Sequence, residues 1–364
     1  MKVLLVLTAG VAVMAASGFV CVRTAAAAPP PDAGVGPTRL EFHEALQLRL
    51  DPLAGTPDAT TVRLRRGRVG LRLVGARWGQ AAMEVAFDGW SLFPGAVAPP
   101  PLTLLELHAT FAVLPERMWL TVGLFRPQLG RESLTSGFVV DSLDKALTQG
   151  PLREHLTGTA PGRAPGVNVG GLLPRQGWSA RYDAGLVAYR AGADSGGGPR
   201  PPLLLARVAW TLGAPESETY ALSLPQNDLR LQPGLTLALQ ASTELGGAAR
   251  SVGMDALLRL SPWVLAAEVH QLNGEQAPRW LVHARTGVNL PGPWRTVVEP
   301  WAQVAHATGP PDAKAVSRLD AGVTWYLARH SLRVTLGTGG WPFQPREAAG
   351  SPGRQLGLSL QHRR

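Results

Sequence analysis

The stretch RMWLTVGLFRPQLGRE, residues 117–132, joins a strand to the start of a long loop. Its first part alternates with a period of two, which indicates a β-strand. One face would carry Met118, Leu120, Val122 and Leu124, and the other Trp119, Thr121, Gly123 and Phe125. The alternation ends at Pro127, because proline has no N–H to donate to a ladder. Residues 127–165 show no clear strand, and connections of that length are usually functional. We therefore expect a strand followed by a loop that folds back into a pore.

The same alternation recurs along the chain, in about sixteen segments of roughly nine to twelve residues, the length that crosses a bilayer at a tilt. Charged side chains mostly share parity with Gly, Thr, Ser and Gln, which leaves one apolar face per strand. A charge on the lipid face would cost about 2–4 kcal/mol near the midplane. The predicted fold class is all-β, a closed antiparallel transmembrane β-barrel of about sixteen strands with an inward-folded loop. A soluble β-sandwich also alternates, but one of this size would be large.

The connections mostly alternate between short turns and long Gly/Pro-rich loops, as in outer-membrane barrels. One connection, Gly213 to Pro233, is long where a short turn is expected. Either it holds further strands or the strand count is wrong by two. Several tryptophans follow short turns and could form an interfacial girdle; the alternative is a core position. These are Trp78, Trp119, Trp178, Trp263 and Trp294.

The N-terminus has the pattern of a secretory signal: Lys2, then an apolar run, then the small residues of 25–28. We predict a signal peptide over residues 1–28 and a barrel over residues 29–364; an uncleaved anchor helix is the alternative. Removing residues 1–28 takes away Lys2, Arg23 and no acid, so the net charge falls from +9 to +7. It also removes Cys21, the only cysteine, which excludes disulfides and thiol catalysis in the remainder.

Two stretches resemble the phosphate-selective porin family, the O and P porins. LRRGRVGLRLVG, residues 64–75, is similar to that family's early Arg-Arg strand, and GLFRPQLGRESLTSG, residues 123–137, to its segment before the constricting loop. The resemblance implies a sixteen-stranded outer-membrane barrel of a Gram-negative bacterium that passes anions, phosphate being one candidate, and that in this family is often a homotrimer. The family's lysine-rich phosphate site has no counterpart, since Lys145 and Lys314 are the only lysines after Lys2.

In this interpretation arginines line a water-filled channel and attract anions. Loop candidates are Arg131 and Lys145, together with Arg153 and Arg163, and Glu132 is expected to anchor the loop by pairing with a lumen arginine. A phase slip near Arg66–Gly67 indicates a β-bulge and leaves Arg66, Arg68 and Arg72 unassigned. By parity the wall candidates are Arg63, Arg65, Arg181, Arg207, Arg259, Arg279, Arg285, Arg295, Arg318 and Arg333.

For any single arginine, pairing with a lumen carboxylate is favoured over contact with a solute. The available partners are Glu84, Asp88, Glu106, Asp183, Glu268 and Asp320. Residues 141–150 could form a short helix within the loop, capped by Asp141 or Ser142.

The predicted function is passive diffusion of small anionic solutes through an outer-membrane porin in contact with lipid. Export argues against nucleic acid, and the sequence suggests no metal site and no cofactor. An outer-membrane enzyme is a second class, but the chain has no Gly-x-Ser-x-Gly elbow and no His-Glu-x-x-His motif, so no catalytic residue is assigned. A plugged barrel that acts as scaffold or adhesin is a third class with the same sequence pattern.

Overall fold

The computed structural model describes most of one compact unit, Pro37–Arg364. The described residues are 38–52, 60–75, 79–88, 90–91, 102–114, 117–138, 142, 145–158, 161–188, 201–224, 232–274, 278–308, 315–328, 332–342 and 355–363. The predicted signal peptide, Trp78 and Asp141 lie outside these residues, as does the side chain of Arg63.

The described residues form one sheet of eighteen strands, of which β4 and β14 have only two residues each. The strands are β1 (Arg39–Pro52), β2 (Thr60–Gly75), β3 (Gly79–Ala86), β4 (Trp90–Ser91), β5 (Thr103–Leu114), β6 (Met118–Phe125), β7 (Ala164–Arg175), β8 (Trp178–Val187), β9 (Leu203–Gly213), β10 (Gly234–Glu244), β11 (Arg250–Leu260), β12 (Trp263–Asn273), β13 (Arg279–Val288), β14 (Leu290–Pro291), β15 (Val297–Ala307), β16 (Val316–Tyr326), β17 (Leu332–Pro342) and β18 (Gln355–Arg363).

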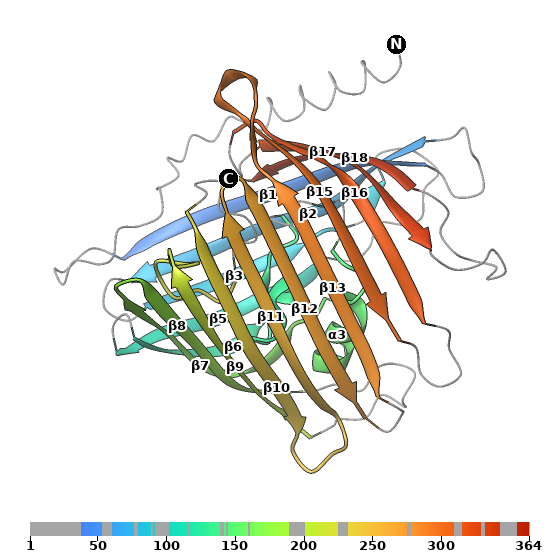
Figure 1. The fold of residues 1–364 in the computed structure, drawn as a ribbon. Coiled ribbons are helices and arrows are strands. Elements are labelled where there is room, and N and C mark those ends of the chain that lie inside the picture. The colour runs from blue at the N-terminus through green and yellow to red at the C-terminus, as the bar shows by residue number, and fades with distance from the viewer. Residues whose placement is uncertain are drawn as a thin grey trace. The chain divides into compact units, whose positions relative to one another are not determined.

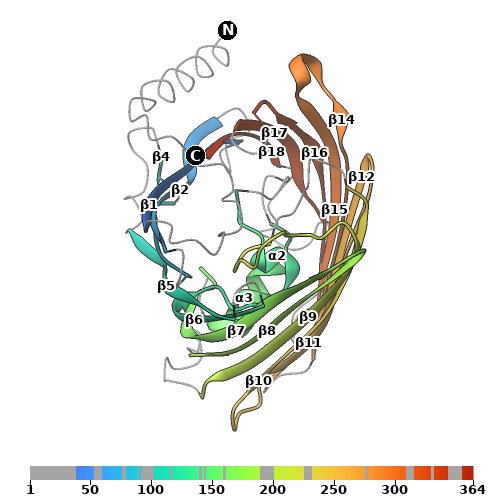
Figure 2. The same ribbon diagram turned by 90° about the vertical axis from the view of Figure 1, so that its left-hand side faces the viewer.

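The sheet closes on itself, because β1 pairs antiparallel with β2 on one side and with β18 on the other. Each remaining long strand pairs with its neighbours in chain order. The result is a ring of sixteen long strands (Figures 1 and 2). This arrangement confirms the predicted all-β fold, the antiparallel pairing and the strand count.

The two faces of the ring have opposite chemistry. On β9, Arg207 points inward and is 1% exposed, whereas Trp210 on the other parity is 48% exposed. On β10, Gln240 is buried and Leu239 is 58% exposed. Inward hydroxyl groups form cross-strand hydrogen bonds, such as Thr110 Oγ1 to Thr121 Oγ1 at 3.0 Å. The apolar outside and polar inside reverse the pattern of a water-soluble protein and suit a hydrocarbon solvent.

The predicted bulge lies in β2. Gln47 of β1 faces Arg66, and the next residue, Leu48, faces Leu64, so Arg65 has no opposite residue. The extra residue reverses parity, and Arg66 and Arg68 therefore reach lumen partners. Arg66 donates to Gln47 Oε1 at 2.7 Å, and Arg68 donates to Asp88 Oδ2 at 2.8 Å.

The connection between β6 and β7 lies inside the ring, with the helices α2 (Arg131–Leu134) and α3 (Gln149–Thr157) (Figure 2). The prediction of a helix over residues 141–150 was wrong, because residues 145–146 have no regular structure, residues 147–148 form a turn and α3 begins at Gln149. Gly158 ends α3 in the left-handed conformation, φ 65°, which glycine adopts without strain. No helix among the described residues is long and apolar enough to span a membrane.

The β9–β10 connection explains the anomaly at residues 213–233. Gly213 pairs with Gly234, so β9 and β10 are adjacent strands and the strand count needs no change. Residues 214–224 meet the constriction loop: Leu224 forms an isolated parallel bridge with Thr135. The described part of the connection, residues 214–224, thus folds inward, although β9 ends at the rim where short turns are expected.

Three of the predicted girdle tryptophans, Trp178, Trp263 and Trp294, are exposed. Trp119 instead stacks on Tyr220 of the β9–β10 connection, with ring centroids 6.4 Å apart. Its parity, which it shares with the buried Thr121 and Phe125, places it on the inward face.

Candidate functional site

The constriction loop, residues 126–163, is held against the wall first by apolar packing. Phe125 and Leu129 at its start, with Leu152 and Leu156 of α3, form one buried cluster with wall residues. Leu152 and Leu156 lie four residues apart and so share one face of α3. Their wall partners are Val187, Leu203, Leu205, Leu272 and Leu281 on β8, β9, β12 and β13. Burial of each leucine contributes about 1.5–3 kcal/mol, which fixes α3 to this side of the lumen.

A second attachment is ionic and centres on Arg131 of α2. Its Nε donates to Asp255 Oδ1 at 2.8 Å, and its Nη2 donates to Glu216 Oε2 at 3.2 Å. Asp255 also accepts from Arg207 Nη2 at 2.9 Å. Asp255 therefore joins two guanidinium groups, one on the loop and one on the wall. Without it, both guanidinium groups would lose a buried counter-charge.

Glu132 differs from the prediction that it pairs with a lumen arginine. Its carboxylate accepts from the Ala146 N–H at 2.7 Å and lies 3.7 Å from His283 Nδ1. Its backbone N–H donates to Glu268 Oε2 at 3.0 Å. The physical reason is the short α2 helix, which turns the neighbouring Arg131 toward Asp255 and leaves Glu132 facing β12 and β13.

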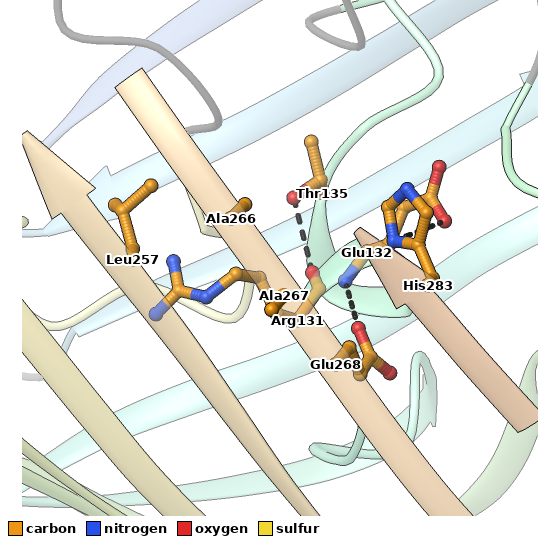
Figure 3. A pocket seen from close by; sticks show the side chains of 8 residues that line it. All are labelled: Arg131, Glu132, Thr135, Leu257, Ala266, Ala267, Glu268 and His283. Carbon is orange, nitrogen blue, oxygen red and sulfur yellow. Dashed lines mark hydrogen bonds and ion pairs between the residues drawn. The ribbon is translucent and has the colours of Figure 1, made fainter. Parts of the chain in front are cut away.

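A small pocket lies between α2 and strands β11–β13 (Figure 3). It is lined by charged groups and small apolar side chains, among them Arg131, Glu132, Leu257, Ala266, Glu268 and His283. Figure 3 shows the Glu132 N–H directed at Glu268 on the facing strand. On this side α2 is thus held to β12 by the hydrogen bond from the Glu132 N–H to Glu268.

The loop also carries positive charge in excess. Arg126 and Arg163 share one carboxylate, Glu106, at 4.0 and 3.3 Å. In the described part of the chain Arg153 makes no ion pair; it packs against Gly162. We call Arg126, Arg153, Arg163 and Glu106 the cationic cluster: two guanidinium groups share one carboxylate, and the guanidinium of Arg153 lies near both of them.

Lys145 lies beside the cationic cluster. Its Nζ donates to the backbone oxygens of Glu132 and Thr135, both at 2.5 Å. Burial, together with the positive charges of Arg153 and Arg126, holds the pKa of Lys145 well below its usual range. Lys145 is therefore a weaker source of positive charge at this point of the lumen than the neighbouring guanidinium groups.

Most predicted wall arginines are found inside the ring, next to acids or carbonyl oxygens. Arg181 pairs with Asp183 at 2.9 Å, Arg318 with Asp320 at 2.7 Å, and Arg285 lies 3.7 Å from Glu299. Arg259 donates to the Ala214 carbonyl, and Arg279 to that of Thr308. Arg333 is buried, and Arg65 is the half-buried bulge residue. Five of the six expected carboxylates, Glu84, Asp88, Glu106, Asp183 and Asp320, pair with arginine, whereas Glu268 pairs with His270.

One predicted wall arginine does not lie on a strand. Arg295 belongs to the 3-10 turn η3 (Pro293–Arg295), is exposed, and has φ 60°. Parity placed it on β15, but that strand begins at Val297. The Pro-Gly-Pro sequence of residues 291–293 moves the start of the strand two residues later than the alternation suggests.

Sequence reasoning missed Glu216 and Tyr220, which contact the loop and the wall from the β9–β10 connection. Neither residue belongs to an alternating segment, so parity gave them no position. The only signal was the unexplained length of residues 213–233. Arg126 was noted for its place in the motif but not for its partners.

We expect loop docking to weaken in acid through His155 of α3. Burial, aided by the positive fields of His270 and Arg279, lowers the pKa of His155 from 6.5 to about 4. The undocked loop therefore binds a proton more readily than the docked loop between pH 6.5 and 4, and docking loses stability as the pH falls through this window. The loss should reach about 1–3 kcal/mol, measured as faster proteolysis of the loop at pH 5 than at pH 7.5. The His155→Gln variant should lose much of this pH dependence; an unchanged dependence would contradict the role of His155.

Solved structures with the same architecture are outer-membrane porins. OmpF of Salmonella typhi superposes with a TM-score of 0.57 at 11% identity, covering 90% of this chain and 98% of that chain. OprB of Pseudomonas putida gives 0.55 at 10% identity, with 90% and 94% covered. An anion-selective porin from Comamonas acidovorans gives 0.53 at 12% identity, with 90% and 100% covered. At such identities the likeness shows the fold alone.

No protein-family model matches the chain, and no curated protein sequence matches it. Membership of the phosphate-selective O and P family therefore stays a prediction. The structural neighbours support a coarser statement: this chain has the fold of outer-membrane porins.

Proposed function

We propose that this protein is an outer-membrane porin that lets small anionic solutes diffuse passively through its lumen. The observation that carries the proposal is the cationic cluster inside the ring, in which Arg126 and Arg163 share the carboxylate of Glu106 and Arg153 adds a third positive charge beside them. A fixed positive potential in a narrow wet passage favours anions over cations. The apolar outer surface supports a position in a lipid bilayer.

The proposal concerns anions as a class. Phosphate is a candidate solute through the sequence resemblance, but Lys145 is engaged by backbone oxygens. Guanidinium groups therefore supply the charge, and they bind carboxylates as well as phosphate. A homotrimer in the outer membrane of a Gram-negative bacterium is part of the same proposal.

The test is the reversal potential of the refolded protein in a planar bilayer with a tenfold KCl gradient. We expect the protein to pass chloride in preference to potassium. The Arg153→Gln/Arg163→Gln variant should lower the chloride-to-potassium permeability ratio by about two- to five-fold, because two positive charges leave a screened, aqueous passage.

The matched control is Arg175→Gln/Arg250→Gln, which removes the same charge from two exposed arginines at strand ends. It should leave the ratio near that of the unmodified protein. A pore that prefers potassium, or an equal effect of both double variants, would contradict the proposal.

A non-conducting barrel that acts as scaffold or adhesin is the second candidate. It is favoured by one observation: the constriction loop and residues 214–224 meet inside the lumen. Absence of any single-channel current from correctly folded protein would support it over the porin.

A further inference from the structure

Residues 214–224, which we call the inner strap, come from the β9–β10 connection and contact the constriction loop at three points. Glu216 pairs with Arg131. The Leu224 N–H donates to the Leu134 carbonyl at 3.3 Å. Gln128 Nε2 donates to the Leu222 carbonyl at 3.0 Å. These contacts join the described strap, from Glu216 to Leu224, to one short part of the loop, residues 128–134.

The inner strap is also fastened to the wall. Tyr220 donates its hydroxyl to Asp183 Oδ1 at 2.6 Å and accepts from Asn168 Nδ2 at 3.0 Å. Its ring stacks on Trp119, and the guanidinium of Arg181 lies 5.0 Å from the ring centroid. A half-buried phenol with a hydrogen bond to a carboxylate and two ring contacts is a firm attachment. The strap thus links β6, β7 and β8 of the wall to the loop.

Charge divides the lumen into two regions. On the side of the strap, three guanidinium groups meet three carboxylates, in the pairs Arg131–Glu216, Arg181–Asp183 and Arg207–Asp255. In the cationic cluster, by contrast, three guanidinium groups lie with one carboxylate, that of Glu106. Glu216 is the only one of the three strap-side carboxylates that does not come from a barrel strand.

Glu216 stays ionised at neutral pH. Burial alone would raise the pKa of its carboxyl, but the charge and hydrogen bonds of Arg131 outweigh burial and lower the pKa below its usual value. The strap therefore places a fully ionised carboxylate, that of Glu216, next to the guanidinium of Arg131.

We infer that the inner strap is a second constriction element and that Glu216 is a selectivity-determining residue. By neutralising Arg131 it removes one positive charge from the lumen and confines the attraction for anions to the cationic cluster. The inference rests on the proposed function, because it assigns the path of the anions within the same pore. The inference thus assigns a constricting role to the β9–β10 connection, whereas the sequence predicts such a role only for the long loop between β6 and β7.

The first experiment compares Glu216→Gln with Glu218→Gln by reversal potential in a KCl gradient. Both variants remove one negative charge from the strap, but Glu218 is exposed, whereas Glu216 faces Arg131. Glu216→Gln leaves Arg131 with one carboxylate partner instead of two, so the chloride-to-potassium ratio should rise by about two- to five-fold relative to the unmodified protein. Glu218→Gln should change it far less. Equal ratios for the two variants would overturn the inference.

This outcome is separable from failure of the proposed function. If the unmodified pore shows no preference for chloride, the proposed function fails. The effect of Glu216 is still read as a shift from whatever ratio the unmodified pore has. An upward shift specific to Glu216→Gln would then support the role of Glu216 as a local charge without supporting an anion porin.

The second experiment tests the contact without any current. Thr135→Cys/Leu224→Cys, made with Cys21→Ser, places two thiols at the bridge between loop and strap. Cα atoms of paired strand residues lie within disulfide range, so oxidation of the folded barrel should cross-link residues 135 and 224 in most molecules. The control pair Thr135→Cys/Leu245→Cys, with its second thiol on an exposed turn, should stay reduced. A folded barrel whose 135–224 pair also stays reduced would overturn the inference.

Discussion

Replacement of residues 135–158 by a short Gly/Ser linker should raise the single-channel conductance at least about two-fold, because pore diameter sets conduction. The segment includes α3, whose Leu152 and Leu156 are buried against the wall. The linker cannot fill this volume, so the passage widens.

The control for the loop variant is the same linker in place of residues 246–248, an exposed turn between β10 and β11. This change should leave the conductance unaltered. An unaltered conductance after replacement of residues 135–158 would remove the constriction role from this loop. Heat-dependent migration on a gel verifies that each variant has folded into a barrel.

The second large effect is expected for Asp255→Ala. The side chain of Asp255 is 0% exposed and accepts hydrogen bonds from both Arg131 and Arg207. Its removal leaves two buried guanidinium groups short of a counter-charge, and breaking a buried pair in this way costs about 3–5 kcal/mol. We expect undocking of α2, seen as rapid proteolysis of the loop and a lower urea midpoint.

Asp88→Ala is the matched comparison, because Asp88 also pairs with an arginine, Arg68, but its side chain is 39% exposed. Partly exposed ion pairs contribute about 0–1 kcal/mol. A small, similar loss of stability in both variants would show that Asp255 does not hold the loop.

The wall of the barrel could be predicted because its rule is local. Parity alone places Trp210 outside and Arg207 inside, and the phase slip near Arg66 correctly indicates a bulge. Each inference needs only a few consecutive residues. The apolar face is strictly maintained because a misplaced charge would be exposed to lipid.

The contacts across the lumen could not be predicted in this way. Arg131 and Asp255 are 124 positions apart in the chain, and parity shows that each points inward without showing which partner it meets. For this reason the prediction that Glu132 pairs with a lumen arginine was wrong. Glu216 and Tyr220 lie on a connection without any alternation of polar and apolar residues. Their contacts therefore become known only from the three-dimensional structure.

The motif that carried the family resemblance has a structural role here. Arg126 donates to the Leu134 carbonyl at 2.6 Å, and Gln128 donates to the Arg126 carbonyl at 2.8 Å. These bonds fold the chain sharply after β6 and direct it into the lumen. The motif therefore explains why the loop turns inward without specifying the solute.

The division of charge between the strap side and the cationic cluster has a consequence for ionic strength. Dissolved salt shortens the Debye length from about 8 Å at 0.15 M to about 3 Å at 1 M, and it acts where water has access. The pairs around Asp255 are dry, whereas Arg163 and Glu106 of the cluster are partly exposed. Concentrated salt should therefore lower the preference for chloride over potassium while leaving the pore diameter unchanged. Ion selectivity would then depend on the salt concentration, whereas the width of the passage would not.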